Sequence, residues 1–363
     1  MTKAYSLLIL AVVIFLMGSL MVYNTTSAEI IDKSLDIALT SAFVKQLFYA
    51  FIGLMCAIVV VWVGIDRIMQ HSGWIMLILT AALLFVFIPG IGMQLNGAKR
   101  WIKIFGVSFQ PSEFVKVFLP LFVIRRLVVN PIRSFSDFLK VLGWIMPPVF
   151  LILIEPDNGS FVIMMTTLLV VFYLFNINKR YWLLPFVMVM LVACALALNM
   201  PHVSRRIEIY IHPEKDLLGK GHQPYQAKIA VGSGSWLGRG LGNSLQKLTY
   251  LPEARSDYIA AIYAEETGFI GALFLITLYF IFAYLGAMIA LAAEDLERFS
   301  LGMTLLFLVC FQVFLNLGVV SGLLPSKGTN LPFFSQGGSS LVANSIIVGM
   351  FFSLAQHRKK VAR

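Results

Sequence analysis

Long apolar runs dominate the chain, and short polar segments separate them. Eight stretches contain no Asp, Glu, Lys or Arg: residues 4–28, 46–65, 68–98, 158–178, 181–204, 267–293, 299–326 and 328–357. A helix that crosses a bilayer needs roughly 20 apolar residues, and most of these stretches reach that length. Two further apolar segments, 112–129 and 138–155, are interrupted by charged residues or by glycine and proline.

This pattern predicts an all-α polytopic membrane protein. We expect ten transmembrane helices, near residues 6–23, 42–64, 74–92, 112–129, 138–155, 160–177, 181–199, 262–288, 300–320 and 338–356. The polar segment 200–260 is predicted to form one large extracytoplasmic loop between helices 7 and 8. Residues 1–363 are therefore expected to be a single integral-membrane domain, with a retained first span and without a separate soluble domain.

Composition and charge support this prediction and orient it. Hydrophobic residues make up 59% of the chain and charged residues 13%, whereas soluble domains carry about 25% charged residues. Most Lys and Arg residues outside the large loop lie in the short segments that face the cytoplasm if both termini are cytoplasmic. Such a bias is typical of cytoplasmic loops. The sequence thus predicts cytoplasmic termini and an external large loop.

Polar motifs are concentrated on the side predicted to be external. They are NGAKRW (96–101), QPSEFVK (110–116), EPDNGS (155–160), the end of the large loop (221–257) and GLLPSKGTNLPFFSQGGSSL (322–341). The internal loops carry only short basic segments. Ionisable groups at a membrane boundary are costly to desolvate and usually have a function. Chemistry is therefore expected on the external face.

Each motif also has a purely structural interpretation. Lys99, Arg100 and Lys103 can anchor lipid headgroups, and Glu113 can simply pair with Lys116 one helical turn away. EPDNGS can be a turn chosen for its geometry. Five such motifs on one face are harder to explain in this way than any one of them.

Cysteine and histidine give no indication of a metal site or of a disulfide framework. Cys56, Cys194 and Cys310 lie far apart inside apolar runs, where free cysteine packs as a small hydrophobic residue. The histidines show no HxxxH or HExxH spacing. No phosphate-binding P-loop or dinucleotide motif is present in the sequence, and we expect no nucleic-acid partner.

The motifs together resemble the SEDS family of polytopic peptidoglycan glycosyltransferases, typified by RodA and FtsW. NGAKRWI, QPSEFVK, PDNGS, GLGNSLQKLTYLPEARSDYI with AEETGFIGA, and LPSKGTNLPFFSQGGSS occur in the family order along nearly the whole chain. The run LGNSLQK followed by YLPEA, and Lys327, resemble the FtsW (cell-division) branch. Gln336 departs from the family pattern, which usually has tyrosine there.

The resemblance implies polymerisation of lipid II, a disaccharide-pentapeptide on undecaprenyl diphosphate, into glycan strands with inversion at the anomeric carbon. Asp257 matches the family's essential aspartate and is expected to be the general base. Arg100, Lys116 and Lys327 are expected to bind the diphosphate. Glu113 is expected to orient Lys116.

Further residues complete the expected site. Asp157 and Gln246 are expected to contact substrate, with supporting roles for Glu253, Glu265, Glu266, Gly240 and Gly242. No dedicated cofactor is expected. A divalent cation, Mg²⁺ or Mn²⁺, could bridge the diphosphate to Asp257 or Glu113.

The family also implies partners and a location. These are lipid II, a class B penicillin-binding transpeptidase, and other divisome or elongasome proteins in the bacterial cytoplasmic (inner) membrane. Septal synthesis during division is the expected role. The competing hypothesis is a lipid II flippase, in which the same basic residues bind diphosphate in transit; a recruiting scaffold is a third.

Overall fold

Helices make up most of the computed structural model, which describes residues 1–33, 39–95, 98–104, 107–155, 157–198, 210–211, 221–247, 254–326 and 328–361. The helices of these ranges are α1 (Thr2–Lys33), α2 (Leu39–Val63), α3 (Ile65–Gln70), α4 (Ser72–Phe85), α5 (Pro111–Val129), α6 (Phe135–Ile154), α7 (Asn158–Leu174), α8 (Lys179–Leu198), α10 (His222–Ser233), α11 (Ile259–Ala290), α12 (Leu296–Val320) and α13 (Gly338–Val361).

A helix lies at each of the ten predicted positions, namely α1, α2, α4 to α8 and α11 to α13. Among the described residues, six helices are long and apolar enough to cross a membrane: Thr2–Thr26, Ala42–Val63, Phe135–Ile154, Ile259–Ala290, Leu296–Val320 and Gly338–Gln356. Helices α4 and α7 are apolar but shorter, and α5 carries four charged side chains. The molecule is therefore a multi-pass membrane protein. That all ten helices cross the membrane is a proposal.

The prediction of an all-α fold is wrong between residues 92 and 109. Strands β1 (Gly92–Leu95), β2 (Ala98–Ile104) and β3 (Val107–Phe109) form an antiparallel sheet in the order β1-β2-β3. Gly92 pairs with Ile102, and Ile102 pairs with Phe109. The third predicted helix ends at Phe85 instead of residue 92, just before Pro89 and Gly90, whose φ of 88° is unsuited to a helix.

Helix α5 lies at the centre of the bundle. It contacts α4, α6, α7, α12 and α13, and most of its side chains are buried, including that of Lys116. Local sequence fixes where neighbouring helices start. Ser134 and Asp137 form a capping box at α6, and the Asp295 side chain accepts a hydrogen bond from Arg298 N at the start of α12.

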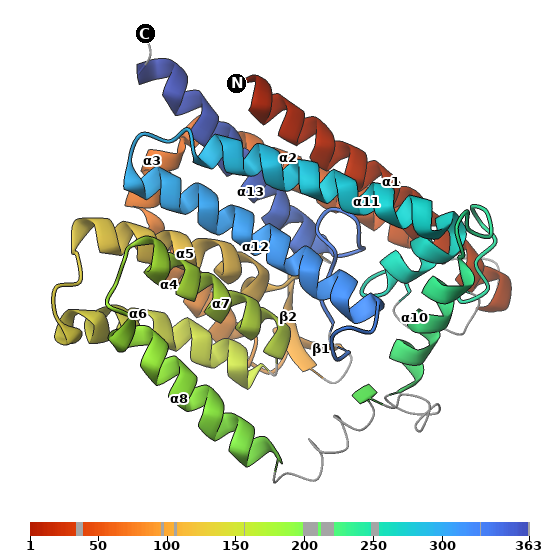
Figure 1. The fold of residues 1–363 in the computed structure, drawn as a ribbon, viewed down its shortest axis with the longest axis horizontal. Coiled ribbons are helices and arrows are strands. Elements are labelled where there is room, and N and C mark those ends of the chain that lie inside the picture. The colour runs from red at the N-terminus through yellow and green to blue at the C-terminus, as the bar shows by residue number, and fades with distance from the viewer. Residues whose placement is uncertain are drawn as a thin grey trace.

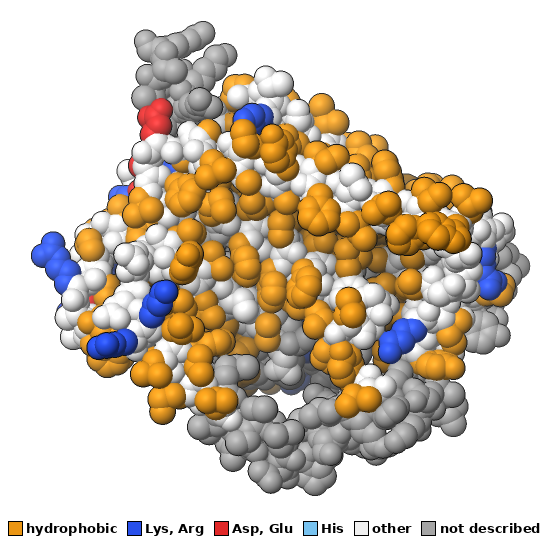
Figure 2. Space-filling view, viewed as in Figure 1, with side chains coloured by type: hydrophobic (Ala, Val, Ile, Leu, Met, Phe, Trp, Pro, Cys, Tyr) orange, Lys and Arg blue, Asp and Glu red, His pale blue; other side chains and the backbone are white. Residues whose placement is uncertain are grey.

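Hydrophobic side chains cover much of the face of the bundle that Figure 2 shows. Trp62, Trp74 and Phe280 are among the most exposed hydrophobic residues. Such a surface suits contact with lipid. Both chain ends lie at one end of the bundle, whereas α10 and the β-sheet lie at the other (Figure 1).

Candidate active site

A polar cavity of about 350 Å³ lies at the sheet end of the bundle, away from the two termini. Strands β2 and β3, the first turns of α5, α7 and α13, and the segments preceding α11 and α13 contribute most of its lining. The lining residues are Arg100, Trp101, Ser108, Gln110, Glu113, Lys116, Asp157, Ser160, Ile163, Ser256, Asp257, Gln312, Gly328, Thr329, Asn330, Gln336, Gly337, Gly338, Ser339 and Ser340.

Three helices begin at this cavity. Helix α5 starts at Pro111, α7 at Asn158 and α13 at Gly338. The N-terminal end of a helix carries a partial positive charge, because its first backbone N–H groups have no partners within the helix. The combined field of the three ends favours a negatively charged ligand.

Arg100 is the more accessible of the two basic side chains in the cavity. Its Nε donates to the backbone oxygen of Glu155 at 3.1 Å. Its guanidinium also lies 3.8 Å from Asp157 Oδ1. These contacts hold the side chain at the cavity wall, where a planar guanidinium can donate two hydrogen bonds to one phosphate group.

Lys116 and Glu113 form a buried ion pair on the first two turns of α5. Lys116 Nζ donates to Glu113 Oε1 at 2.7 Å, and both side chains are largely shielded from solvent. A buried ammonium group needs such a partner, because an unpaired charge in a poorly solvated position is strongly unfavourable. The pair confirms the proximity predicted from the i,i+3 spacing.

Asp157 holds the cavity wall together. Its Oδ1 accepts from Ser160 N at 3.1 Å and thereby caps α7. Its Oδ2 accepts from Ser112 Oγ at 3.2 Å and from Gln110 Nε2 at 3.3 Å. Oδ2 therefore ties the start of α5 to α7, whereas Oδ1 caps α7 itself. The expected contact of Asp157 with substrate stays a prediction.

Glu155 lies directly behind Arg100 and differs from the other acidic residues near the cavity. It is 1% exposed, and neither side-chain oxygen has a hydrogen-bond partner. Burial, together with the negative charge of Asp157, raises the pKa of Glu155 to about 8, although Arg100 opposes this shift. The carboxyl group is therefore largely protonated at neutral pH.

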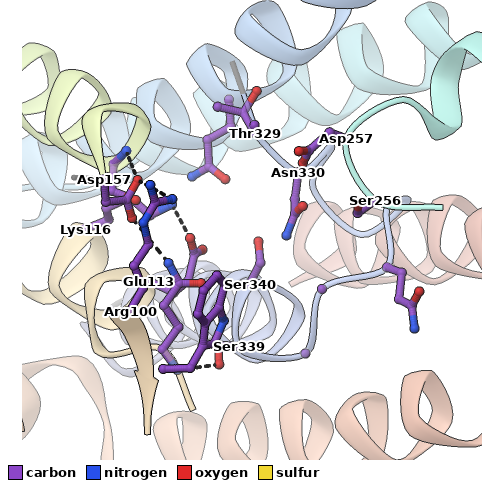
Figure 3. A pocket seen from close by; sticks show the side chains of 18 of the residues that line it. Arg100, Glu113, Lys116, Asp157, Ser256, Asp257, Thr329, Asn330, Ser339 and Ser340 are labelled. Atoms are coloured by element: carbon purple, nitrogen blue, oxygen red, sulfur yellow. Dashed lines mark hydrogen bonds and ion pairs between the residues drawn. The ribbon is translucent and has the colours of Figure 1, made fainter. Parts of the chain in front are cut away.

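Asp257 lies across the cavity from the ionic cluster of Arg100, Lys116, Glu113 and Asp157 (Figure 3). The buried Asn316 of α12 fixes its backbone, because Nδ2 donates to Asp257 O at 2.9 Å and to Thr329 O at 2.6 Å. The carboxylate lies close to Gly328, where an added Cβ would be 2.7 Å from Oδ2. A side chain at position 328 would displace it.

Glu265 and Glu266 are not among the residues that line this cavity. They bind the segment 239–247, which precedes them in the chain. Glu265 accepts from Ser244 Oγ at 2.5 Å and from Leu245 N at 3.1 Å, and it pairs with Arg239 at 3.6 Å. Their supporting role in the site stays a prediction, because the contacts that the structure shows are with this segment.

The Glu266 carboxylate joins a buried cluster that we call the α1 clamp, formed by Asn24, Lys247 and Glu266. Lys247 Nζ donates to Glu266 Oε1 at 2.9 Å and to Asn24 Oδ1 at 2.7 Å. Asn24 Nδ2 donates to Glu266 Oε2 at 2.6 Å. The clamp attaches the segment before α11 to α1.

The remaining predicted residues lie elsewhere. Gln246, Gly240 and Gly242 belong to the anchored segment and do not line the cavity. Lys327 and Glu253 lie outside the described residues. Roles for these five in the site stay predictions.

The cavity contains polar residues that sequence reasoning did not single out as site residues. Ser108, Gln110, Ser256, Asn330 and Gln312 line it. Most of them adjoin predicted motif residues. Gln312 had a separate signal, because it is a polar residue in the middle of the apolar run 299–326.

Within the described ranges, no three residues among His, Cys, Asp and Glu lie close enough together to hold a metal ion. Glu113 is already paired with Lys116. A cation held by one carboxylate and by substrate phosphates would not require such a group. The divalent cation remains a prediction.

Curated relatives resemble the chain over most of its length. Stage V sporulation protein E of Bacillus subtilis (strain 168) is 34% identical over 356 residues, which cover 97% of each protein. The probable peptidoglycan glycosyltransferases FtsW of Nitrosococcus halophilus and Pseudomonas fluorescens are 36% and 37% identical. These matches cover 88% and 86% of this chain and 84% and 78% of the relatives.

Solved structures share the fold. A chain from a peptidoglycan synthase complex, described in terms of the coordination of polymerization and crosslinking, aligns with a TM-score of 0.80 and 26% identity over 98% of both chains. The rod shape determining protein RodA of Thermus thermophilus aligns with a TM-score of 0.70 and 24% identity, over 98% of this chain and 97% of that one. The latter likeness shows the fold alone.

A family model described as "Cell cycle protein", covering FtsW, RodA and SpoVE, matches residues 4–360. Nearly the whole chain therefore takes part in the likeness, including all the described residues that line the cavity. The chain belongs to the FtsW/RodA/SpoVE family.

Proposed function

We propose that this protein is a peptidoglycan glycosyltransferase that polymerises lipid II into glycan strands. The observation that carries the proposal is the cavity, which places Asp257 opposite Arg100 and Lys116. Glycosyl transfer from a lipid diphosphate needs a base for the acceptor and positive charge for the leaving group. The wall that carries Asp257 supplies the base, and the wall that carries Arg100 and Lys116 supplies the positive charge.

In the proposed reaction the acceptor 4-hydroxyl attacks the anomeric carbon of the lipid-linked sugar. A new C–O bond forms on one face as the bond to the diphosphate breaks on the other, which inverts the anomeric centre. Asp257 accepts the hydroxyl proton as general base. The electron pair of the broken bond leaves on undecaprenyl diphosphate.

The leaving diphosphate would bind at the wall opposite Asp257. Arg100 lies at the cavity surface and is held there by Glu155 and Asp157. The Lys116 charge is balanced by Glu113, so its contribution is weaker unless substrate competes with that carboxylate. The N-termini of α5, α7 and α13 add favourable potential without mobile side chains. A Mg²⁺ or Mn²⁺ ion would be held by the substrate phosphates together with Asp257 or Glu113 and would help neutralise the leaving diphosphate.

The proposal includes a topology. Ten helices cross the cytoplasmic membrane, both termini are cytoplasmic, and the cavity with the large loop between α8 and α11 faces outward. The common position of the two termini supports it, as does the location of the cavity at the opposite end. So does the positive charge of the predicted internal segments.

A class B penicillin-binding transpeptidase is the proposed partner, along with other divisome or elongasome proteins. One solved relative is a chain of a peptidoglycan synthase complex that coordinates polymerization and crosslinking. The FtsW names of several relatives and the family description "Cell cycle protein" support septal synthesis as the proposed cellular role.

The test compares wild type with Asp257→Asn in a lipid II polymerisation assay, with purified protein and its cognate transpeptidase. We expect glycan polymer from wild type and none from the variant, with lipid II binding retained. Glu294→Gln is the control, because it removes an exposed carboxylate away from the cavity. Near-normal polymer from Asp257→Asn would refute the general base. No polymer from wild type, with lipid II translocation in sealed vesicles, would identify a flippase.

A further inference from the structure

Helix α11 is interrupted at its tenth residue, Gly268. Gly268 has φ 70° and ψ −166°, which no helix contains. The hydrogen bonds that a regular helix would form from Phe269 N to Glu265 O and from Ile270 N to Glu266 O are therefore replaced. Four backbone groups are left to find partners elsewhere.

Residues 235–240 of the preceding segment supply all four partners. Phe269 N donates to Ser235 O at 2.8 Å, and Ile270 N donates to Trp236 O at 3.2 Å. Glu265 O accepts from Arg239 N at 3.0 Å, and Glu266 O accepts from Gly240 N at 3.0 Å. The interruption thus leaves no unsatisfied backbone group among these four.

The insertion requires glycine at the crossing point. An added Cβ on Gly268 would collide with the backbone of Gly238 and of Trp236, and one on Gly238 would collide with the backbone of Glu266. Both glycines also have positive φ. The two backbones therefore touch directly.

Large apolar side chains project outward at this crossing. Trp236 is 69% exposed, Leu237 78%, Phe269 54% and Ile270 55%. Trp236 packs edge-to-face against Phe269, with ring centroids 5.2 Å apart. We call these four residues the kink patch. It continues onto the exposed side chains of Leu273 and Phe274 on the same helix.

The length of α11 sets the depth of the kink patch in a membrane. Its 32 residues span roughly 48 Å at 1.5 Å per residue, whereas the hydrocarbon core is about 30 Å thick. The part from Gly268 to Ala290 alone spans roughly 35 Å. A membrane-crossing α11 therefore places the kink patch at one boundary of the hydrocarbon core.

We infer that the segment 235–241 dips into the leaflet at the α10 end of the molecule, with the kink patch in contact with lipid acyl chains. Irregular backbone at this depth is tolerated where its polar groups are satisfied, and the backbone groups of Ser235, Trp236, Arg239 and Gly240 that face α11 are satisfied by it. Arg239, the charged residue of this segment, is paired with Glu265. Tryptophan at the membrane boundary is typical of such anchors. The inference requires only that α11 cross the membrane, so it stands independently of the proposed reaction.

The inference can be tested by spin-label accessibility on the full-length protein in nanodiscs of phosphatidylethanolamine and phosphatidylglycerol. A nitroxide is attached at Leu237→Cys after Cys56, Cys194 and Cys310 are replaced. Collision with oxygen, which concentrates in lipid, is compared with collision with a water-soluble nickel chelate. Phe280→Cys on the apolar face of α11 is the lipid control, and Glu294→Cys at the α11–α12 turn is the water control.

We expect the label at position 237 to collide with oxygen several-fold more often than with the nickel chelate, as at Phe280→Cys. A ratio equal to that of Glu294→Cys would overturn the inference, as would a label shielded from both reagents, which would indicate protein contact. Leu241→Cys provides a second, independently labelled position, because Leu241 is also exposed and ends the segment 235–241. Size-exclusion profiles identify any variant that fails to fold.

Discussion

Single side chains around the cavity divide into those that face its space and those that hold its walls. Arg100 and Asp257 line the cavity. Asp157 also lines it and accepts hydrogen bonds from Ser112 Oγ and Ser160 N. Asn316 donates from Nδ2 to Asp257 O, while its Oδ1 has no hydrogen-bond partner among the described residues. Asn316 is buried in α12 and fixes the carbonyls of both Asp257 and Thr329. The position of the proposed base therefore depends on Asn316, which is not among the residues that line the cavity.

Gly328 gives the sharpest test at this scale. In Gly328→Ala, the new Cβ would lie 2.7 Å from Asp257 Oδ2, so the carboxylate must move. We expect polymerisation to fall at least tenfold, since small misplacements near reacting groups have large effects, while thermal stability changes little. Gly232→Ala, where nothing lies within 4 Å of the added atom, is the matched control. Equal activity of the two variants would contradict this account of Asp257.

Glu155 predicts a pH-dependent stability difference. Its pKa is raised from 4.5 to about 8 in the folded protein. Its contribution to stability is therefore complete below the unfolded pKa and is lost as the pH rises through the folded value. As the pH rises from about 5 to about 8, we therefore expect the Tm of wild type to fall relative to the Tm of Glu155→Gln. If the difference in Tm between wild type and Glu155→Gln is constant over this range, Glu155 does not titrate as described. Glu294→Gln, which removes an exposed carboxylate, is the control.

At the scale of elements, α11 combines three tasks in one helix. Its start follows Asp257, its kink accepts the inserted segment, and Glu266 forms the α1 clamp with Asn24 and Lys247. These features lie within ten residues of one another along the chain. The segment before α11 is therefore fixed both to α11 itself and to α1.

The α1 clamp is expected to stabilise this arrangement strongly. Lys247→Met leaves Glu266 buried without its partner charge, and breaking a buried pair costs about 3–5 kcal/mol. We expect a clear loss of Tm in detergent, partly restored in the double variant Lys247→Met/Glu266→Gln, where the unpaired charge is gone. Lys140→Met, which removes an exposed ion pair, should have little effect. A Lys247→Met protein as stable as that control would exclude a stabilising role for the clamp.

At the scale of the whole molecule, the bundle separates its chain ends from its cavity. The termini lie at one end, and the starts of α5, α7, α11 and α13 lie around the cavity at the other. Every element that contributes a first turn to the cavity therefore runs in the same direction through the bundle. This common direction is what brings the helix N-termini together.

The proposed topology predicts the accessibility of three sites in sealed, oriented vesicles. Protease added to inside-out vesicles should remove tags at both termini. An impermeant maleimide should label Asn243→Cys only in right-side-out vesicles, on a background without native cysteines. Asn243 is exposed in the segment before α11. Labelling of Asn243→Cys on the same side as the tags would contradict the topology.

The helices could be predicted from the sequence because each forms a long apolar run. The sheet was missed, since residues 92–109 mix apolar, basic and glycine residues without alternation. Asn96-Gly97, between β1 and β2, was an available hairpin signal. Arg100, Glu113, Lys116, Asp157 and Asp257, all named from the sequence, line one cavity, and their roles stay predictions.

The orientations of several acidic side chains depend on tertiary contacts and could not be predicted from the sequence. Glu265 and Glu266 lie near Asp257 in sequence, yet they face the anchored segment. Their direction depends on the kink at Gly268 and on the insertion, neither of which is encoded in helical periodicity. The orphaned Glu155 carboxyl likewise reflects packing around it rather than its motif.

The α1 clamp also bears on how the chain is assembled. Lys247 and Glu266 are 19 residues apart, whereas Asn24 is separated from Glu266 by 242 residues. Contacts distant in sequence form only after the intervening chain is available. During synthesis α1 enters the bilayer long before Lys247 and Glu266 emerge from the ribosome. The hydrogen bonds of Asn24 to these two residues can therefore form only after the start of α11 has been made. We expect the inserted segment to join α11 first, and closure of this unit onto the first helix to be a late step of biogenesis.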